Sequence, residues 1–484
     1  MTNLTRRGLL QGSASALAMG ILPAAKALAG EQVSPVMARL SSYMAEAKDH
    51  ALPPEVVEKT KQIVLDTFAA MISGSDLPPG KLAIQLARLH SGEKVATVAG
   101  SNVLCGPIEA AQSNGMLAHS DETDDSHSPS LSHPGCSVVP VALAASEQFD
   151  GDGTRFLRAV ALGYDIGPRM TMTLGRDIAM TEGHKSTHSI AGTFGSAAAG
   201  ACVAGFGAQQ MRWLLDYTAQ QASGIASWQR DTDHIEKAFV FGGMPARNGI
   251  TATLLVQVGG TGVDDVLSGA DNYLLANAPK ADPAMLIDKL GERYEVMRDN
   301  FKKWTVGSPI QAPLDALQNI MKRRPLDPEQ VRQISVRVAT NEASVVNNRD
   351  IPDICLQHMM AVMLIDGTAT FKSAHDIKRM KDPAVLRQRA KVQLIPDAEL
   401  QRNLPARQAI VEVTLSDGMK LTERVNGVRG TVENPMTREE VIDKARDLIV
   451  PVLGAATSSK LIQTVFEIEK IKSLRDLRPL LQRA

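Results

Sequence analysis

Apolar positions recur at helical spacing through the first half of the chain. Val56, Ile63, Val64 and Phe68 lie close to a 3.6-residue period, behind a Pro53-Pro54 start that suits a helix N-terminus. The same kind of pattern predicts helices over residues 81–90, 108–119, 136–147, 156–170, 190–206, 211–225 and 248–258. We therefore predict an all-helical domain over residues 33–268.

The pattern becomes mixed after Ser268. Ile334, Val336 and Val338 alternate like a strand, and the apolar alternation on either side of Asp417-Gly418 predicts a hairpin. Helical patterns return over residues 438–452 and 459–471. We predict a mainly α fold, in which the large all-helical domain is completed by residues 435–484 and a smaller α/β lid domain spans residues 269–434.

The N-terminus has the features of an export signal. A twin-arginine pair, Arg6-Arg7, precedes an apolar alanine-rich stretch, and Ala27-Leu28-Ala29 forms an A-x-A cleavage site. We predict a twin-arginine signal peptide over residues 1–29, export by the Tat machinery and a periplasmic location. The alternative is a disordered basic leader. No other stretch reaches the about 18 apolar residues that a membrane span requires.

Composition excludes several classes of function. The chain has 484 residues, a formal net charge of -1 and 22% charged residues, so nothing indicates nucleic-acid binding. Four cysteines are widely spaced without a CxxC pair, which argues against a zinc ribbon or an iron–sulfur cluster. They are Cys105, Cys136, Cys202 and Cys355.

The most polar segment of the helical half runs from Ala118 to His127 and is followed by His133. It contains four carboxylates between alanine-rich, apolar sequences. Glu122 and Ser126 are four residues apart, so both lie on one helical face if the preceding helix continues. His133 precedes a proline, which favours extended backbone and a side chain projected from a loop. The alternative is a solvated acidic surface.

Two further segments carry cationic groups. His184 and His188 flank Lys185 in a loop that enters a small-residue helix, whose N-terminus favours a bound carboxylate. A zinc pair four residues apart is the alternative, although the glutamate of an H-E-x-x-H motif is missing. Lys237 lies beside an apolar run, where it either pairs with a buried carboxylate, binds an anionic substrate or lies on the surface.

These residue types together favour acid–base chemistry on a polycarboxylate. Such a reaction needs cations to hold the carboxylates, a base to remove a proton alpha to one of them and an acid to protonate a leaving hydroxyl. Histidine, lysine, glutamate and serine supply these groups, so we expect neither a metal nor another cofactor.

The chain resembles the MmgE/PrpD family, which includes 2-methylcitrate dehydratases and cis-aconitate decarboxylases, over nearly its whole length after Val33. The motifs that carry the resemblance are Asn114-Gly115 through His119, the acidic run, His133-Pro134-Gly135, Gly163-Tyr164-Asp165, Gly192-Thr193-Phe194-Gly195, Ala246-Arg247-Asn248-Gly249 and Gln357-His358. The resemblance implies a helical domain with an α/β lid, a homodimer, and cofactor-free lyase chemistry in a cleft between the domains.

The resemblance also implies roles for single residues. His133 matches an active-site histidine, and His188 matches a second, with His184 as its rival. Lys237 matches the family's lysine. Glu122 stands where the family usually has Asp, and it would orient a histidine or act as a base. We expect His133, His188 and Lys237 to bind substrate carboxylates and move protons.

Besides Glu122, three positions depart from the family pattern. Ser126 replaces a threonine and would donate a hydrogen bond to substrate. Gln311 stands where dehydratases and decarboxylases have histidine, and His358 where the decarboxylase has tyrosine. We expect Gln311 and His358 to close the site from the lid. Because an amide cannot replace an imidazole as proton donor, the family's decarboxylase mechanism does not transfer directly.

The predicted function is therefore dehydration of a small hydroxy-polycarboxylate. Three alternatives remain: epimerisation by proton removal alpha to a carboxylate of a dicarboxylate, decarboxylation of the cis-aconitate type, and non-catalytic carboxylate binding in the periplasm.

Overall fold

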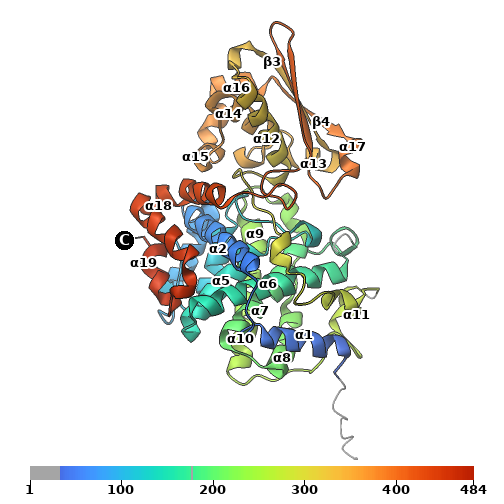
Figure 1. Ribbon diagram of the computed structural model, residues 1–484, viewed down its shortest axis with the longest axis vertical. Coiled ribbons are helices and arrows are strands. Elements are labelled where there is room, and N and C mark those ends of the chain that lie inside the picture. The colour runs from blue at the N-terminus through green and yellow to red at the C-terminus, as the bar shows by residue number, and fades with distance from the viewer. Residues whose placement is uncertain (1–32, 176–177, 279, 484) are drawn as a thin grey trace, which may run out of the picture.

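The computed structural model describes residues 33–175, 178–278 and 280–483, in two domains that lie one above the other (Figure 1). The predicted signal peptide lies outside the described residues. The larger domain contains α1 (Pro35–Glu46), α2 (Pro54–Gly74), α3 (Pro78–Leu89), α4 (Pro107–Ala118), α5 (Gly135–Phe149), α6 (Gly153–Leu174), α7 (Thr187–Ala204), α8 (Ala208–Gln221), α9 (Ile235–Ala238), α10 (Met244–Gln257) and α11 (Tyr273–Asn277). A short ladder of β1 (Ala96–Thr97) and β2 (Leu104–Cys105) is its only sheet among the described residues. The predicted mainly α fold is confirmed.

The smaller domain is built on a four-stranded sheet of order β4-β3-β5-β6. Its elements are α12 (Ser308–Arg323), β3 (Val331–Ala339), α13 (Thr340–Val346), α14 (Leu356–Asp366), α15 (Phe371–Ala374), α16 (Pro383–Arg389), β4 (Val392–Asp397), α17 (Ala398–Arg402), β5 (Ala409–Leu415) and β6 (Lys420–Val425). Strands β5 and β6 pair antiparallel, as the hairpin pattern predicts, whereas β3 and β4 pair parallel. Helices α12, α14 and α16 lie together beside this sheet (Figure 1).

The C-terminal segment returns to the larger domain. Helix α18 (Arg438–Phe466) packs along α2, and α19 (Arg478–Leu481) ends near it (Figure 1). Leu448 and Leu461 belong to the core of the larger domain. By length and composition alone α18 resembles a membrane span. However, it is broken at Gly454, whose φ is 79°, and its buried side chains face the protein core.

Small residues let α6 and α7 approach closely. A Cβ added to Gly163 would lie 2.8 Å from the carbonyl oxygen of Gly195, and one added to Gly167 would lie 2.2 Å from that of Ala191. Both distances are too short for any side chain, so these positions require glycine. The Gly/Ala-rich helix is therefore a packing element, and it holds the segment before its N-terminus in place.

The chain crosses between the domains through two adjacent segments. Leu286 and Phe301 belong to the core of the larger domain, whereas Trp304 belongs to that of the smaller one. Phe301 N donates to Gly430 O over 2.9 Å, which joins the outgoing and returning segments. The change of core thus falls between residues 301 and 304, later than the compositional change at residue 268, because residues 269–301 pack on the helical domain.

Candidate active site

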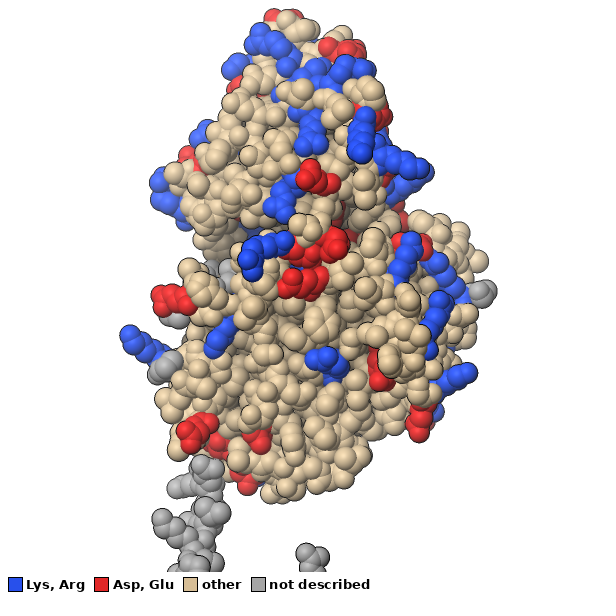
Figure 2. All heavy atoms as spheres, turned by 180° about the vertical axis from the view of Figure 1, so that it is seen from behind, with Lys and Arg blue, Asp and Glu red and all other residues tan. Residues whose placement is uncertain are grey.

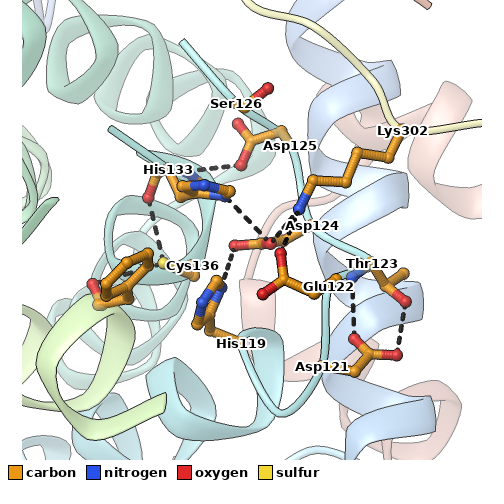
Figure 3. A network of polar contacts seen from close by, with 12 residues as sticks. His119, Asp121, Glu122, Thr123, Asp124, Asp125, Ser126, His133, Cys136 and Lys302 are labelled. Atoms are coloured by element: carbon orange, nitrogen blue, oxygen red, sulfur yellow. Dashed lines mark hydrogen bonds and ion pairs between the residues drawn. The ribbon is translucent and has the colours of Figure 1, made fainter. Parts of the chain in front are cut away.

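The acidic segment is irregular rather than helical. Helix α4 ends at Ala118, and His119 has φ −115° and ψ 35°. The Asp121 carboxylate then accepts from Thr123 N over 3.0 Å and from Thr123 Oγ1 over 2.6 Å, which replaces helical backbone bonding with a local turn. The expectation that Glu122 and Ser126 share a helical face is therefore wrong. Figure 3 shows the Ser126 hydroxyl pointing away from Glu122.

All four carboxylates of this segment are buried, so the interpretation as a solvated acidic surface is wrong. Each has its own set of partners, although Glu122 and Asp124 share Lys302. Asp121 lies against His375, Glu122 against Lys237 and Lys302, Asp124 against His119, His133 and Lys302, and Asp125 against Tyr164. Figure 2 shows Asp and Glu side chains gathered at the waist between the two domains. The segment therefore contacts both the helical domain and the lid.

Asp124 orients two histidines. Its Oδ2 lies 2.8 Å from His119 Nδ1, its Oδ1 lies 3.2 Å from His133 Nδ1, and Lys302 Nζ lies 3.4 Å from the same Oδ1. Burial alone would raise the pKa of Asp124, but the charges of His119, His133 and Lys302 hold it well below its usual range. An ionised Asp124 therefore fixes which ring nitrogen of each histidine faces the rest of the site (Figure 3).

Glu122 lies between two ammonium groups. Lys237 Nζ donates to its Oε1, and Lys302 Nζ lies 3.4 Å from its Oε2. Although burial would raise the pKa of Glu122, Lys237 and Lys302 lower it well below the usual range. Lys237 Nζ also lies 5.3 Å from the centre of the Phe241 ring, a favourable position for a cation.

Four histidine rings gather around Phe241. The His188 ring stacks on Phe241 with centroids 3.8 Å apart, and His133 lies 5.2 Å from His188. His119 stacks on Phe241 at 4.5 Å and lies 5.2 Å from His234. Three of these rings thus contact Phe241, and His234 joins them through His119.

Three of these imidazoles, those of His133, His188 and His234, have lowered pKa values that favour the neutral form. Burial lowers the pKa of His188 well below its usual range, and the neighbouring His133 and His119 lower it further. Burial likewise lowers the pKa of His133, although Asp124 opposes this effect, and it lowers the pKa of His234 to about 3 together with Lys237. A buried neutral imidazole can accept a proton, so the cluster supplies bases at neutral pH.

Four of the eight predicted site residues come together in this cluster: Glu122, His133, His188 and Lys237. The two loop histidines differ in burial. His184 is exposed on the surface, where its backbone φ is 51°, whereas His188 lies in the first turn of α7 and is 9% exposed. The prediction of His184 as a substrate ligand is therefore not supported by its position.

The side-chain amide of Gln311 is hydrogen-bonded to backbone groups. Its Oε1 accepts from Trp304 N over 3.1 Å, and its Nε2 donates to Trp304 O over 2.7 Å and to Val306 O over 2.9 Å. These bonds hold the segment that leads into the lid. Both ends of the amide are already bonded, so a substrate would have to displace one of these contacts, and substrate binding by Gln311 stays a prediction.

His358 is buried inside the lid. The residue is 0% exposed on α14, and neither ring nitrogen has a hydrogen-bond partner among the described residues. Burial, together with Arg389 and Arg379, lowers its pKa to about 4. The charges that act on His358 come from the lid rather than from the histidine cluster, and its closing of the site stays a prediction.

A cavity of about 290 Å³ lies beside the cluster, where the crossing segments meet. Ser126, Gln311 and Lys302 line it, with Arg298 and Arg407 as further cations. Lys302 connects the two regions, because its stem lines the cavity while its ammonium lies between Glu122 and Asp124. Ser126 thus lies in this cavity rather than against the histidines.

Several residues of the site escaped the sequence analysis: His119, Asp124, His234, Phe241 and Lys302 from the larger domain and crossing segment, and Asp353 and His375 from the lid. His119 and Asp124 carried a signal, because both lie in the acidic run itself. His234 and Phe241 lie within four residues of Lys237, which the sequence had indicated. Lys302, Asp353 and His375 had no such signal, since they are distant in sequence and lie in segments of ordinary composition.

Two groups of side chains are close enough to share a metal ion: His119 with Asp124 and His133, and His119 with Glu122 and His234. The ligand atoms of the first group are engaged with one another, since both Nδ1 atoms face Asp124. In the second group, His119 Nε2 and His234 Nε2 have no hydrogen-bond partner among the described residues, whereas Glu122 is bonded to Lys237. Lys302 supplies a positive charge to both carboxylates. A metal ion at either group would therefore have to displace existing contacts.

The fold and the site together define a two-domain, mainly helical protein with a buried cluster of imidazoles, carboxylates and ammonium groups at the domain junction. Residues 38–285 match the MmgE/PrpD N-terminal domain, and residues 304–468 match the MmgE/PrpD C-terminal domain. The chain therefore belongs to the MmgE/PrpD family.

Curated relatives of the chain share its full length. The cis-aconitate decarboxylase of Homo sapiens is 26% identical over 457 residues, which cover 89% of this chain and 91% of the relative. That of Aspergillus terreus is 23% identical over 461 residues, covering 89% and 92%, and that of Mus musculus is 24% identical over 458 residues, covering 90% and 91%. These relatives are enzymes, and their reaction is a lyase reaction.

Proposed function

We propose that this protein is a lyase that acts on a small polycarboxylate, and that the reaction it catalyses is dehydration. The observation that carries the proposal is the pair of neutral rings, His133 and His188, 5.2 Å apart and beside the ammonium groups of Lys237 and Lys302. The rings are suited to remove a proton, and the ammonium groups are suited to hold substrate carboxylates.

The proposed elimination breaks a C–H and a C–O bond of the substrate and forms the second bond of an alkene, while one proton goes to a base and another comes from an acid. His133 or His188 takes the proton alpha to a carboxylate, the C–H electron pair becomes the second bond of an alkene, and the neighbouring C–O bond breaks. The hydroxide leaves as water after it receives a proton from an acid in the site. Lys237 and Lys302 stabilise the negative charge that develops on the carboxylate next to the reacting carbon.

Decarboxylation is the second candidate, and it is supported by the activity named for the relatives. In that reaction a C–C bond breaks, carbon dioxide leaves, and the electron pair that stays on carbon is protonated by an acid of the site. It needs no base, whereas the cluster described above is rich in neutral imidazoles.

Epimerisation alpha to a carboxylate uses the same bases and returns the proton to the opposite face.

The experiment is a substrate panel with the purified protein spanning residues 30–484. Citrate, 2-methylcitrate, cis-aconitate and dicarboxylates with an alpha proton are incubated in buffered D₂O, and products are followed by NMR and by carbon dioxide release. New alkene signals indicate dehydration, carbon dioxide indicates decarboxylation, and deuterium incorporation alone indicates epimerisation. Ligand-raised thermal stability without turnover would instead support a carboxylate-binding protein.

Metal independence, export and oligomeric state are parts of the same proposal. We expect turnover to persist after exhaustive treatment with a chelator and to gain nothing from added Zn²⁺ or Mg²⁺. We expect the full-length chain to reach the periplasm, and the Arg6→Lys, Arg7→Lys double variant to stay in the cytoplasm. We expect a homodimer in solution, which size-exclusion chromatography with light scattering would measure.

A further inference from the structure

Two lid residues face the acidic segment of the larger domain. His375, at the end of α15, places Nε2 3.0 Å from Asp121 Oδ2, and its Nδ1 lies 2.7 Å from Phe371 O. The second lid residue is Asp353, in the short 3-10 helix Pro352–Ile354. Both belong to the lid, and charged groups of the helical domain act on both of them.

Asp353 is a buried carboxyl group without a full set of partners. The residue is 3% exposed, and its Oδ1 has no hydrogen-bond partner among the described residues. The charges that act on it come from both domains: His375 in the lid, and Glu122, Asp121 and Lys237 in the larger domain. A buried polar atom without a partner is costly to the fold, so such an atom at a domain junction points to a bound ligand group.

We propose that Asp353 is a catalytic residue of the lid, which donates a proton to the substrate group that leaves or collapses during the lyase reaction. His375 is a positioning residue, because its contact with Asp121 fixes the lid segment against the acidic segment. The proposal rests on the proposed function, and it adds the acid that this function requires. It applies to elimination and to decarboxylation alike.

The proton balance of this step is simple. In the elimination, the Asp353 O–H bond breaks and its proton forms water with the departing hydroxide, while an imidazole of the larger domain holds the proton taken from carbon. In the decarboxylation, the same proton forms a C–H bond with the electron pair left by carbon dioxide. Exchange with water afterwards returns both groups to their starting states.

The electrostatics of the junction agree with this role. Burial raises the pKa of Asp353 to about 7, with Glu122 and Asp121 acting in the same direction and His375 and Lys237 opposing them. A carboxyl group in this range is partly protonated at neutral pH and can give up its proton easily. The lid groups expected from sequence, Gln311 and His358, face elsewhere, so Asp353 is the acid that the lid presents to the cluster.

The first test compares Asp353→Asn with Asp350→Asn. Asp350 lies three residues earlier in the same lid segment and is exposed, so its variant controls for general effects of losing a carboxylate there. We expect Asp353→Asn to lower kcat by about 100-fold or more and Asp350→Asn to leave it within about two-fold of wild type. Asp353→Glu, which keeps the acid, should recover part of the activity.

The pH profile separates catalysis from structure. Wild-type activity should fall as the pH rises through about 7, because the acid becomes ionised, and this limb should disappear in Asp353→Asn. A purely structural role would lower activity without removing the limb. Equal rates and equal profiles for Asp353→Asn and wild type would overturn the proposal.

A measurement that needs no turnover distinguishes failure of the proposed lyase function from failure of the proposed role of Asp353. Infrared spectra at pH 6 should show that Asp353→Asn loses one carbonyl stretch of a protonated carboxylic acid relative to wild type, and that Asp350→Asn loses none. If the substrate panel gives no product while this band is assigned to Asp353, the proposed lyase function fails and the protonated lid carboxyl stands. If no variant removes such a band, Asp353 is ionised and the acid assignment fails.

Discussion

His375 and Asp121 join the lid to the helical domain through an ion pair with a nitrogen–oxygen distance of 3.0 Å. The side chains are 17% and 4% exposed, so water screens the pair only weakly. Burial alone would lower the pKa of His375, but Asp121 outweighs this effect and the pKa is raised to about 9. The imidazole is therefore charged at neutral pH, unlike the histidines of the cluster.

This pair predicts a pH-dependent contribution to stability. Because the pKa of His375 is higher in the folded state, its contribution is fully present below the unfolded value near 6.5 and is lost as the pH rises through about 9. The shift corresponds to about 3 kcal/mol. We expect His375→Gln to lower the free energy of unfolding by about that amount at pH 6 and by far less at pH 10, as measured by urea denaturation.

The matched control is His184→Gln, since His184 is exposed and its side chain has no ion pair among the described residues. Its unfolding free energy should follow wild type at both pH values. A deficit of His375→Gln that does not shrink between pH 6 and pH 10 would mean that the ion pair is not its source.

Lys302 predicts a large effect of removing one buried charge. Its ammonium lies 3.4 Å from both Glu122 and Asp124, and its side chain is 3% exposed. In Lys302→Met two buried carboxylates lose a shared partner, which typically costs about 3–5 kcal/mol. Lys420→Met is the control, because Lys420 pairs with Glu412 on the surface and should cost less than about 1 kcal/mol. Chemical denaturation of both variants measures the difference, and equal costs would contradict the buried charge network.

The two loop histidines predict opposite effects on activity. His188 lies in the cluster against Phe241, whereas His184 is on the surface. We expect His188→Asn to lower kcat by about 100-fold or more, as for loss of an acid–base group, and His184→Asn to leave kcat near the wild-type value. Steady-state kinetics on the substrate found in the panel would decide this. Loss of activity in His184→Asn alone would reverse the assignment.

The fold could be predicted from sequence because its signals are local. The alternation of Ile334, Val336 and Val338 marks β3, and glycines such as Gly163 mark the close contact of α6 with α7. The domain boundary was harder to place. The segment between residues 269 and 301 has little regular structure, and its packing on the helical domain depends on scattered apolar side chains such as Leu286.

The site was only partly predictable because a pairing between distant residues leaves no periodic trace. Glu122 and His133 belong to one unusual segment, so composition reveals them. Asp353 and His375 lie in the lid, and only the folded chain brings them to Asp121. The helical position predicted for Ser126 is wrong because the helix ends earlier. The Asp121 carboxylate accepts hydrogen bonds from the backbone and hydroxyl groups of Thr123, and this turn ends the helical register.

Gln311 predicts a structural effect where the sequence suggests a substrate ligand. Its amide makes three hydrogen bonds to the backbone of Trp304 and Val306, and the residue is 3% exposed. Gln311→Ala leaves those backbone groups without partners, so we expect a loss of about 2–4 kcal/mol in unfolding free energy and a KM within about two-fold of wild type for folded enzyme. Gln318→Ala, on the same helix but bonded to a half-buried Lys303, should cost less than about 1 kcal/mol. A large rise in KM without loss of stability would return Gln311 to the substrate site.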